Sequence, residues 1–299
     1  MLKIRIFALS MLIALSAFVS GNAQDGDTRA GHFAITKISG ITYANVDDIE
    51  LKLDLYLPEG AVQPPLVVWV HGGAWRGGSR DRTYSEYLVN SGYAMASLDF
   101  RLSGQAKFPA QVHDIKAGIR FLRRQSAEYG YDASRVGILG ASSGGHLAAL
   151  VGVTNGHRDL EGNVGEYRAE SSDVQAIVSL FGASNLTTIL KQSTPHGLKV
   201  RVPALDLFLG GQPDEVADIA RLASPVFHVD ADDPPLLLLH GDQDPQMPIN
   251  QAHELFGKYQ DLALDSQFEV VYGAAHGGEE FGDSRRQALI RSFLDERLR

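Results

Sequence analysis

The 299-residue sequence contains no cysteine. Disulfide bonds, thiolate metal ligands and a cysteine nucleophile are therefore all excluded. Basic residues are also in the minority, with 27 Lys and Arg against 36 Asp and Glu, so the formal net charge is −9. A nucleic-acid partner is not expected at this charge balance. Without disulfides the fold must rest on its core, and 44% hydrophobic residues over this length suffice for one large core.

Long apolar runs are scarce as well. After Ile6–Val19, no stretch is long enough to span a bilayer. Two basic residues precede that run and four small or short polar residues follow it, which is the order of a secretory signal. We expect residues 1–23 to be a signal peptide cleaved after Ala23. The mature chain, 24–299, would be secreted or periplasmic without stable membrane insertion; the alternative is an uncleaved N-terminal anchor.

From residue 33 onward, strand-like and helix-like patterns alternate without a linker or repeat. The middle strand-like runs are continuously apolar, which suits strands buried on both faces of a parallel sheet. The first two alternate polar and apolar residues, which suits an antiparallel edge. The eight expected strands are residues 35–43, 51–57, 66–71, 93–101, 136–139, 174–181, 236–240 and 268–272.

Helical patterns separate these runs. A helix is expected from Pro109, at its first position, to about Gly130, with apolar residues at three- and four-residue spacing. Further helices are expected at residues 143–152, 249–262 and 283–297. The alternation predicts an α/β fold, a mostly parallel eight-stranded sheet with helices on both faces. Residues 153–213 interrupt it, and we expect a single domain with a cap-like insertion there. The alternative is a surface insertion without a role.

The run Gly140-Ala141-Ser142-Ser143-Gly144 is a G-x-S-x-G motif between an apolar stretch and a helical one. A serine in a sharp strand-to-helix turn is lifted out of the sheet edge, and only glycines leave room beside it. Ser142 has a glycine at both required offsets, whereas Ser143 has an alanine two residues before it. We therefore predict that Ser142 is a nucleophile.

A serine nucleophile needs a base, a group that orients the base, and donors for an oxyanion. His276 lies in a small-residue loop after the last expected strand, which favours it as the base over histidines in helical patterns. Two aspartates follow the preceding strand. We favour Asp244, which Pro245 stiffens; Asp242 is the alternative, and the one not used is expected to form a turn. The order serine, aspartate, histidine is typical of G-x-S-x-G hydrolases.

The oxyanion donors are expected after an early strand, where His71-Gly72-Gly73-Ala74 follows residues 66–70. The backbone amides of Gly73 and Ala74 are the candidates, joined by that of Ser143 directly after the nucleophile. The alternative is a tight loop that needs glycine only for its backbone angles. His71 is expected to brace this loop.

Four segments carry a resemblance to a known family. They are residues 70–79, 137–150, 220–225 and 232–241. They resemble α/β-hydrolases of the esterase/lipase group, and are similar to bacterial bifunctional feruloyl and acetyl-xylan esterases and, more distantly, to hormone-sensitive-lipase-like carboxylesterases. The resemblance implies the α/β-hydrolase fold and serine ester hydrolysis through an acyl-enzyme, without cofactor or metal. Implied substrates are short-acyl or feruloyl esters, such as those of plant polysaccharides. In such families the acid is the aspartate of H-G-x-x-D, which is Asp244 here.

The chain departs from the family pattern at three places. Ala74 stands where many relatives have a third glycine, and Ser143 stands where alanine is usual. Residues 186–205 match the group least, and this is where specificity for the acyl or sugar part of the substrate would be set. An amide or peptide hydrolase of the same fold, arylformamidase- or peptidase-like, is the alternative activity. A non-catalytic binding protein would lack a member of the triad.

Overall fold

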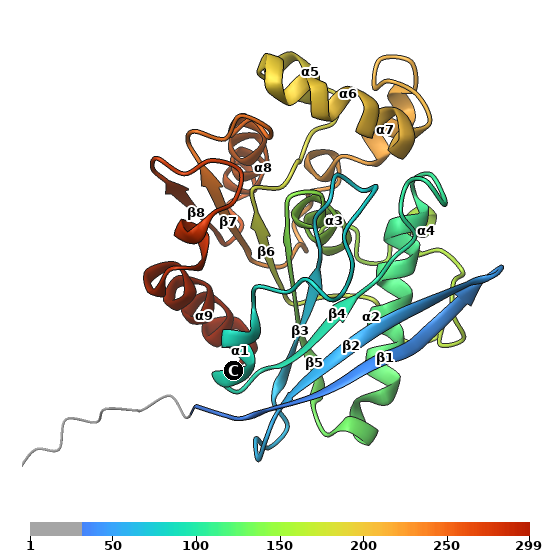
Figure 1. The fold of residues 1–299 in the computed structure, drawn as a ribbon, viewed down its shortest axis with the longest axis vertical. Coiled ribbons are helices and arrows are strands. Elements are labelled where there is room, and N and C mark those ends of the chain that lie inside the picture. The colour runs from blue at the N-terminus through green and yellow to red at the C-terminus, as the bar shows by residue number, and fades with distance from the viewer. Residues whose placement is uncertain (1–31) are drawn as a thin grey trace, which may run out of the picture. The chain divides into compact units, whose positions relative to one another are not determined.

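Eight strands form one sheet in the computed structural model, which describes residues 32–299 (Figure 1). The predicted signal peptide and its cleavage site lie outside the described residues. The strand order is β1-β2-β4-β3-β5-β6-β7-β8. The strands are β1 (Ile35–Val46), β2 (Ile49–Pro58), β3 (Pro65–Val70), β4 (Ala94–Leu98), β5 (Asp132–Ala141), β6 (Ala176–Leu180), β7 (Leu236–Gly241) and β8 (Ser266–Val271).

The sheet is parallel except at one edge. β1 pairs with β2, and β2 with β4, in antiparallel fashion, while all other neighbours are parallel. This confirms the antiparallel edge predicted from the alternating runs. Every residue of β3, β6 and β7 is buried, as expected for continuously apolar strands. Because parallel strands end at the same edge, the loops after β3, β5, β7 and β8 meet there.

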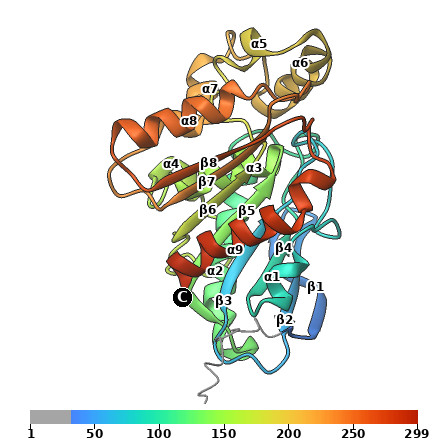
Figure 2. The same cartoon turned by 90° about the vertical axis from the view of Figure 1, so that its left-hand side faces the viewer.

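Helices cover both faces of the sheet, and alternate residues of β3 show why. Val68 packs in a core cluster with α2 (Ala110–Tyr129), α3 (Ser143–Gly152) and α8 (Asn250–Asp261). Trp69 faces the other way, into a cluster with α1 (Glu86–Asn90) and α9 (Ser284–Leu298). Figure 2 shows α9 and α1 in front of the sheet. The four predicted helices are confirmed to within about two residues.

Two details of the helices differ from, or add to, the sequence expectations. Pro109 precedes α2 as its N-cap instead of occupying the first helical position, and Gly130 ends the helix in a left-handed conformation with φ 80°. A glycine favours this angle because it has no Cβ. Within residues 32–299, no helix combines the length and the apolar character needed to cross a membrane.

The boundaries expected for the cap-like insertion, residues 153–213, need correction. That range contains α4 (Arg158–Glu161) and also β6, a buried strand of the sheet. The helical excursion lies between β6 and β7 and comprises α5 (Ile189–Gln192), α6 (Pro195–Leu209) and α7 (Ala217–Leu222), so it continues past residue 213. Both views place these three helices together at the top of the picture (Figures 1 and 2). β6 lies within the expected strand 174–181, so the excursion begins after that strand and not at residue 153.

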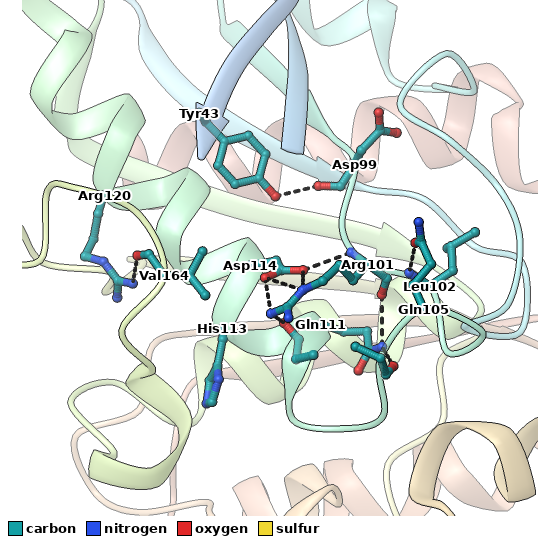
Figure 3. A network of polar contacts seen from close by, with 12 residues as sticks. Tyr43, Asp99, Arg101, Leu102, Gln105, Gln111, His113, Asp114, Arg120 and Val164 are labelled. Carbon is teal, nitrogen blue, oxygen red and sulfur yellow. Dashed lines mark hydrogen bonds and ion pairs between the residues drawn. The ribbon is translucent and has the colours of Figure 1, made fainter. Parts of the chain in front are cut away.

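A buried polar network ties α2 to the segment after β4 (Figure 3). Arg101 donates from Nε and Nη2 to the two oxygens of Asp114, at 2.8 and 2.7 Å, and its backbone N–H donates to the same carboxylate at 2.9 Å. Gln111 donates to the carbonyl of Arg101 at 2.9 Å. The Asp114 side chain has no exposed surface, so its charge is balanced entirely inside the protein.

Candidate active site

Ser142 occupies a strained turn between β5 and α3. Its φ of 57° and ψ of −122° are rare for a residue with a side chain. Its backbone N–H donates to the carbonyl of Leu180 on β6 at 2.9 Å, which fixes the turn. A Cβ on Gly140 would overlap the carbonyl of Gly144, and one on Gly144 would overlap that of Val70. The two glycines of the motif are therefore required by close packing, as the sequence predicts.

The structure brings Ser142, His276 and Asp244 into one hydrogen-bond chain. Ser142 Oγ lies 2.8 Å from Nε2 of His276, and Nδ1 of His276 lies 2.6 Å from Oδ2 of Asp244. A carboxylate can only accept, so Nδ1 carries the proton and Nε2 is free to accept the serine hydroxyl. The three residues follow β5, β7 and β8, which explains how side chains up to 134 positions apart converge.

Asp244, and not Asp242, is the aspartate that contacts His276. Its other oxygen, Oδ1, accepts the backbone N–H groups of Gln246 and Met247 at 2.8 Å each. Burial opposes ionisation of this carboxyl, but hydrogen bonds from His240 and His276 outweigh it and hold the pKa of Asp244 well below its usual range. Asp242 instead accepts the backbone N–H of Gly273 at 2.6 Å. Gly273 is 31 positions further along, in the loop after β8, so Asp242 links two loops and does not make the local turn expected of the aspartate left over.

His240 is a buried neighbour of the acid that the sequence reasoning did not single out. It is 1% exposed, its Nε2 lies 3.0 Å from the carbonyl of Met247, and the same nitrogen lies 3.4 Å from Oδ2 of Asp244. Because a carbonyl only accepts, Nε2 carries the proton, and His240 braces the Asp244–Met247 turn. The histidine of the H-G-x-x-D motif was the available signal for it. Phe181 was also missed; its ring makes an edge contact with His276 at 4.9 Å.

The loop after β3 has an unusual backbone. Gly73, Ala74 and Trp75 have φ values of 126°, 53° and 59°, three consecutive residues on the left-handed side. Among residues 32–299, no acceptor pairs with the backbone N–H of Gly73, Ala74 or Ser143. Free amides in strained backbone beside a serine are the donors that an oxyanion requires.

His71 braces this loop, as its position predicts. Its ring stacks on Phe100, with centroids 4.4 Å apart, and Nδ1 lies 2.9 Å from the carbonyl of Gly72. Burial lowers the pKa of His71, which keeps it neutral. A Cβ on Gly78 would overlap the His71 ring, so the glycines after Trp75 allow the loop to close over it.

The remaining histidines near the motifs have structural partners. Nδ1 of His146, in α3, accepts the indole N–H of Trp75 at 3.1 Å, and Nε2 lies 2.7 Å from the carbonyl of Ala223. Burial lowers the pKa of His146 to about 4. It is therefore neutral at pH 7, and both of its ring nitrogens are engaged by Trp75 and Ala223. His113 and His253 lie in α2 and α8, as expected from their helical patterns.

A cavity of about 910 Å³ opens onto the triad. Its lining includes Ser142, His276, Gly73, Ala74 and Phe181. Further aromatic and apolar lining residues are Trp69, Tyr84, Tyr87, Phe281 and Ile290. No cluster of three or more potential metal-binding side chains occurs in the described part of the chain. A serine, a base with an orienting acid, and free amides around one cavity constitute machinery for acyl transfer.

The chain is similar to known esterases in sequence and structure. The model of the BD-FAE family matches residues 53–259. A Mycobacterium tuberculosis protein described as probable carboxylic ester hydrolase LipM is 30% identical over 286 residues, 92% of this chain and 61% of that protein. A solved truncated form of a carbohydrate esterase from gut microbiota superposes with a TM-score of 0.80 at 31% identity, covering 89% of this chain and 96% of that one.

A second solved structure, a bifunctional GH43-CE protein of Bacteroides eggerthii, has a TM-score of 0.79 at 34% identity and covers 87% of this chain but 35% of that one. The chain spans between about half and three fifths of the length of the first curated relatives it matches. The family match covers more than half of the chain, and these neighbours share its sheet. The protein has the α/β-hydrolase fold and belongs to the BD-FAE family.

Proposed function

We propose that this protein is a serine carboxylic-ester hydrolase that works through an acyl-enzyme. The observation that carries the proposal is the hydrogen-bond chain from Ser142 through His276 to Asp244, set beside free backbone amides in one cavity. The names of the family's relatives, a carboxylic ester hydrolase and carbohydrate esterases, support the same activity.

The reaction begins when Ser142 Oγ attacks the ester carbonyl carbon and its proton passes to Nε2 of His276. Asp244 accepts the Nδ1–H bond of the resulting imidazolium and stabilises its charge. The carbonyl oxygen becomes an oxyanion and accepts N–H groups from Gly73, Ala74 and Ser143. Each such donor is worth roughly 3–4 kcal/mol in the transition state.

The tetrahedral intermediate collapses when the bond to the alcohol oxygen breaks. His276 gives its proton to that oxygen, and the alcohol leaves while the acyl group stays on Ser142. Water then attacks the acyl-enzyme, with His276 accepting its proton, and the serine is regenerated as the acid departs. Each step uses groups whose positions are described above and no cofactor.

For substrates, we propose short-acyl or feruloyl esters of carbohydrates. The two solved neighbours are described as a carbohydrate esterase and a GH43-CE protein. Among the residues that line the cavity, the exposed Tyr84 and the half-buried Tyr87 offer aromatic surface for an aromatic acyl group. Export by the predicted signal peptide, with secretion or a periplasmic location, belongs to the same proposal.

The test is a panel of acetyl, butyryl, long-acyl and feruloyl esters with acetylated xylan, given to the wild type and to Ser142→Ala. We expect hydrolysis of acetyl or feruloyl esters that disappears in the variant. An aryl anilide matched to an aryl acetate distinguishes the amide-hydrolase alternative: faster turnover of the anilide would overturn the esterase assignment. N-terminal sequencing of the exported protein tests cleavage after Ala23.

A further inference from the structure

Arg201 lies on α6, in the segment that resembles the family least. The residue is 1% exposed, yet it lines the same cavity as Ser142 and His276. The mechanism above does not use it. A charged side chain that is withdrawn from solvent and faces a reaction cavity needs a physical explanation.

Two contacts place the guanidinium between two loops of the site. Nε donates to the carbonyl of Gln246 at 3.3 Å, and the backbone N–H of Gln246 in turn donates to Asp244. The guanidinium carbon lies 5.8 Å from the ring of Trp75, the residue after Ala74. Arg201 therefore stands between the loop that holds the acid and the loop that supplies the oxyanion donors.

Among the described residues, 32–299, Arg201 has no counter-ion. Nη1 is buried without any hydrogen-bond partner, and within residues 32–299 no Asp or Glu lies at ion-pair distance from the guanidinium. Burial lowers the pKa of Arg201 to about 10, so the group is still a cation at neutral pH. The nearest acid, Asp244, is already occupied by two histidines and two backbone amides.

The two other cationic side chains of residues 32–299 that are as deeply buried, Lys116 and Arg120, are both paired with Glu161. Arg123, which is half-buried, has only the backbone carbonyls of Ala133 and Asp173 as partners. An isolated buried charge is costly, and it becomes favourable only when an anion joins it. A guanidinium with a free edge matches a carboxylate, because two parallel N–H groups can meet its two oxygens.

We propose that Arg201 binds a carboxylate carried by the ester substrate. The proposal rests on the proposed ester hydrolase function and narrows its substrate class to anionic esters. The carboxylate is part of either the acyl half, as in a monoester of a dicarboxylic acid, or the alcohol half, as in an acylated uronic or hydroxy acid. Arg201 is then a specificity-determining residue that fixes the substrate relative to Ser142.

Two matched substrate pairs distinguish these sources. For the acyl half, mono-para-nitrophenyl glutarate is compared with para-nitrophenyl valerate. For the alcohol half, para-acetoxybenzoate is compared with its methyl ester. Each pair is assayed with the wild type, with Arg201→Met and with Arg201→Lys. Lys199→Met is the control, since it removes one positive charge from an exposed position on the same helix.

We expect the wild type to favour the anionic member of one pair. Arg201→Met should lower kcat/KM for that substrate about 10- to 100-fold, because the charge-assisted contact to its carboxylate is lost. The neutral partner makes no such contact and should stay within about threefold, even though the bond from Nε to the carbonyl of Gln246 is also removed. Arg201→Lys should retain part of the preference, and Lys199→Met should retain all of it. Thermal unfolding establishes that each variant is folded.

If Arg201→Met loses equal activity on anionic and neutral esters, Arg201 is a structural residue and the proposal is overturned. The proposal is also overturned if the wild type hydrolyses neutral esters and shows no preference for either anionic ester. The esterase assignment would stand in both cases. If no ester is hydrolysed, the proposed function fails instead. Calorimetry then measures whether para-acetoxybenzoate or mono-para-nitrophenyl glutarate binds to Ser142→Ala. If one of them binds, and binds more weakly to Ser142→Ala/Arg201→Met, the carboxylate site at Arg201 is supported. If neither compound binds, the site is overturned.

Discussion

Arg101 and Arg201 are both largely withdrawn from solvent, with 14% of the Arg101 side chain and 1% of Arg201 exposed, but they have opposite electrostatic surroundings. Arg101 meets the carboxylate of Asp114 with two N–H groups (Figure 3), and this hydrogen bonding raises its pKa. Arg201 has one backbone carbonyl as acceptor, and burial lowers its pKa to about 10.

The difference shows how the two regions are used. Around Arg101, the charge is paired and the hydrogen bonds are satisfied by other groups of the protein. These bonds hold α2 to the segment after β4. Around Arg201 the charge is unpaired within the described residues, and it lines a cavity that strained backbone and free amides also line. Unbalanced charge and strain reduce stability and persist where function requires them. The predictions below test this contrast, from the largest effect to the smallest.

Removing the nucleophile should have the largest effect. Ser142→Ala should lower kcat on para-nitrophenyl acetate by about 10⁴- to 10⁶-fold, because the attack on the carbonyl is lost. The alanine occupies the same turn, so the free energy of unfolding should change little. Stopped assays and urea unfolding measure both quantities. If the variant retains more than about one per cent of the activity, Ser142 is not the nucleophile and the cavity is not the active site.

Breaking the closed ion pair should produce the largest loss of stability. Arg101→Met leaves the carboxylate of Asp114 buried without its guanidinium, and we expect a loss of about 3–5 kcal/mol in the free energy of unfolding. Urea unfolding at neutral pH measures it. The double variant Arg101→Met/Asp114→Leu is the control and should recover part of the loss. A loss below about 1 kcal/mol would mean that the pair is not needed for the fold.

The pH dependence of stability should report the neutral state of His146. Its pKa is about 4 in the folded protein, below the ordinary value of 6.5, with burial as the main cause and Arg201 as a contributor. Between these values the unfolded chain binds more protons. The contribution of this group to stability is therefore full above pH 6.5. As the pH decreases from 6.5 to 4, the free energy of unfolding decreases by at most about 1.4 kcal/mol per pH unit.

Arg201→Met should make that fall shallower, since the repulsion of protonated His146 is relieved. Urea unfolding between pH 4 and 7 gives the slope for both proteins, and the histidine ring signals in NMR spectra assign it to His146. If the slope and the ring titration are unchanged in the variant, the charge of Arg201 does not act on His146. The contrast between an unpaired Arg201 and a paired Arg101 would then lose this support.

The fold and the triad were predictable because each depends on local signals in a fixed order. Continuously apolar runs identified the parallel strands, and the glycines around Ser142 identified the elbow through steric need. The base followed from its loop after the last strand. The choice of Asp244 over Asp242 could not come from local sequence alone: both follow β7, and only the backbone turn at residues 244–247 decides which carboxylate reaches His276.

Arg201, His240 and Phe181 were not identified in advance, and the start and end of the helical excursion were placed wrongly. The contacts of Arg201 join α6 to Gln246 and to Trp75, which are 45 and more than a hundred residues away. Nothing in the neighbouring sequence of an arginine on a helix states whether a carboxylate will lie opposite it. Such properties arise from the packing of distant segments, which periodicity and motif spacing do not describe.

The smallest expected effect is the change in the free energy of unfolding caused by Arg201→Met, and it decides the comparison between Arg101 and Arg201. The methionine keeps an unbranched side chain beside Trp75 and removes a buried charge that has no counter-ion. We therefore expect the free energy of unfolding to stay within about 1 kcal/mol of the wild type or to rise, opposite in sign to the same substitution at Arg101. Urea unfolding of the two methionine variants side by side measures the difference. A loss at Arg201 as large as that at Arg101 would mean that the fold depends on both arginines. The charge of Arg201 would then serve the fold, as that of Arg101 does. It would not mark a binding site for an anion.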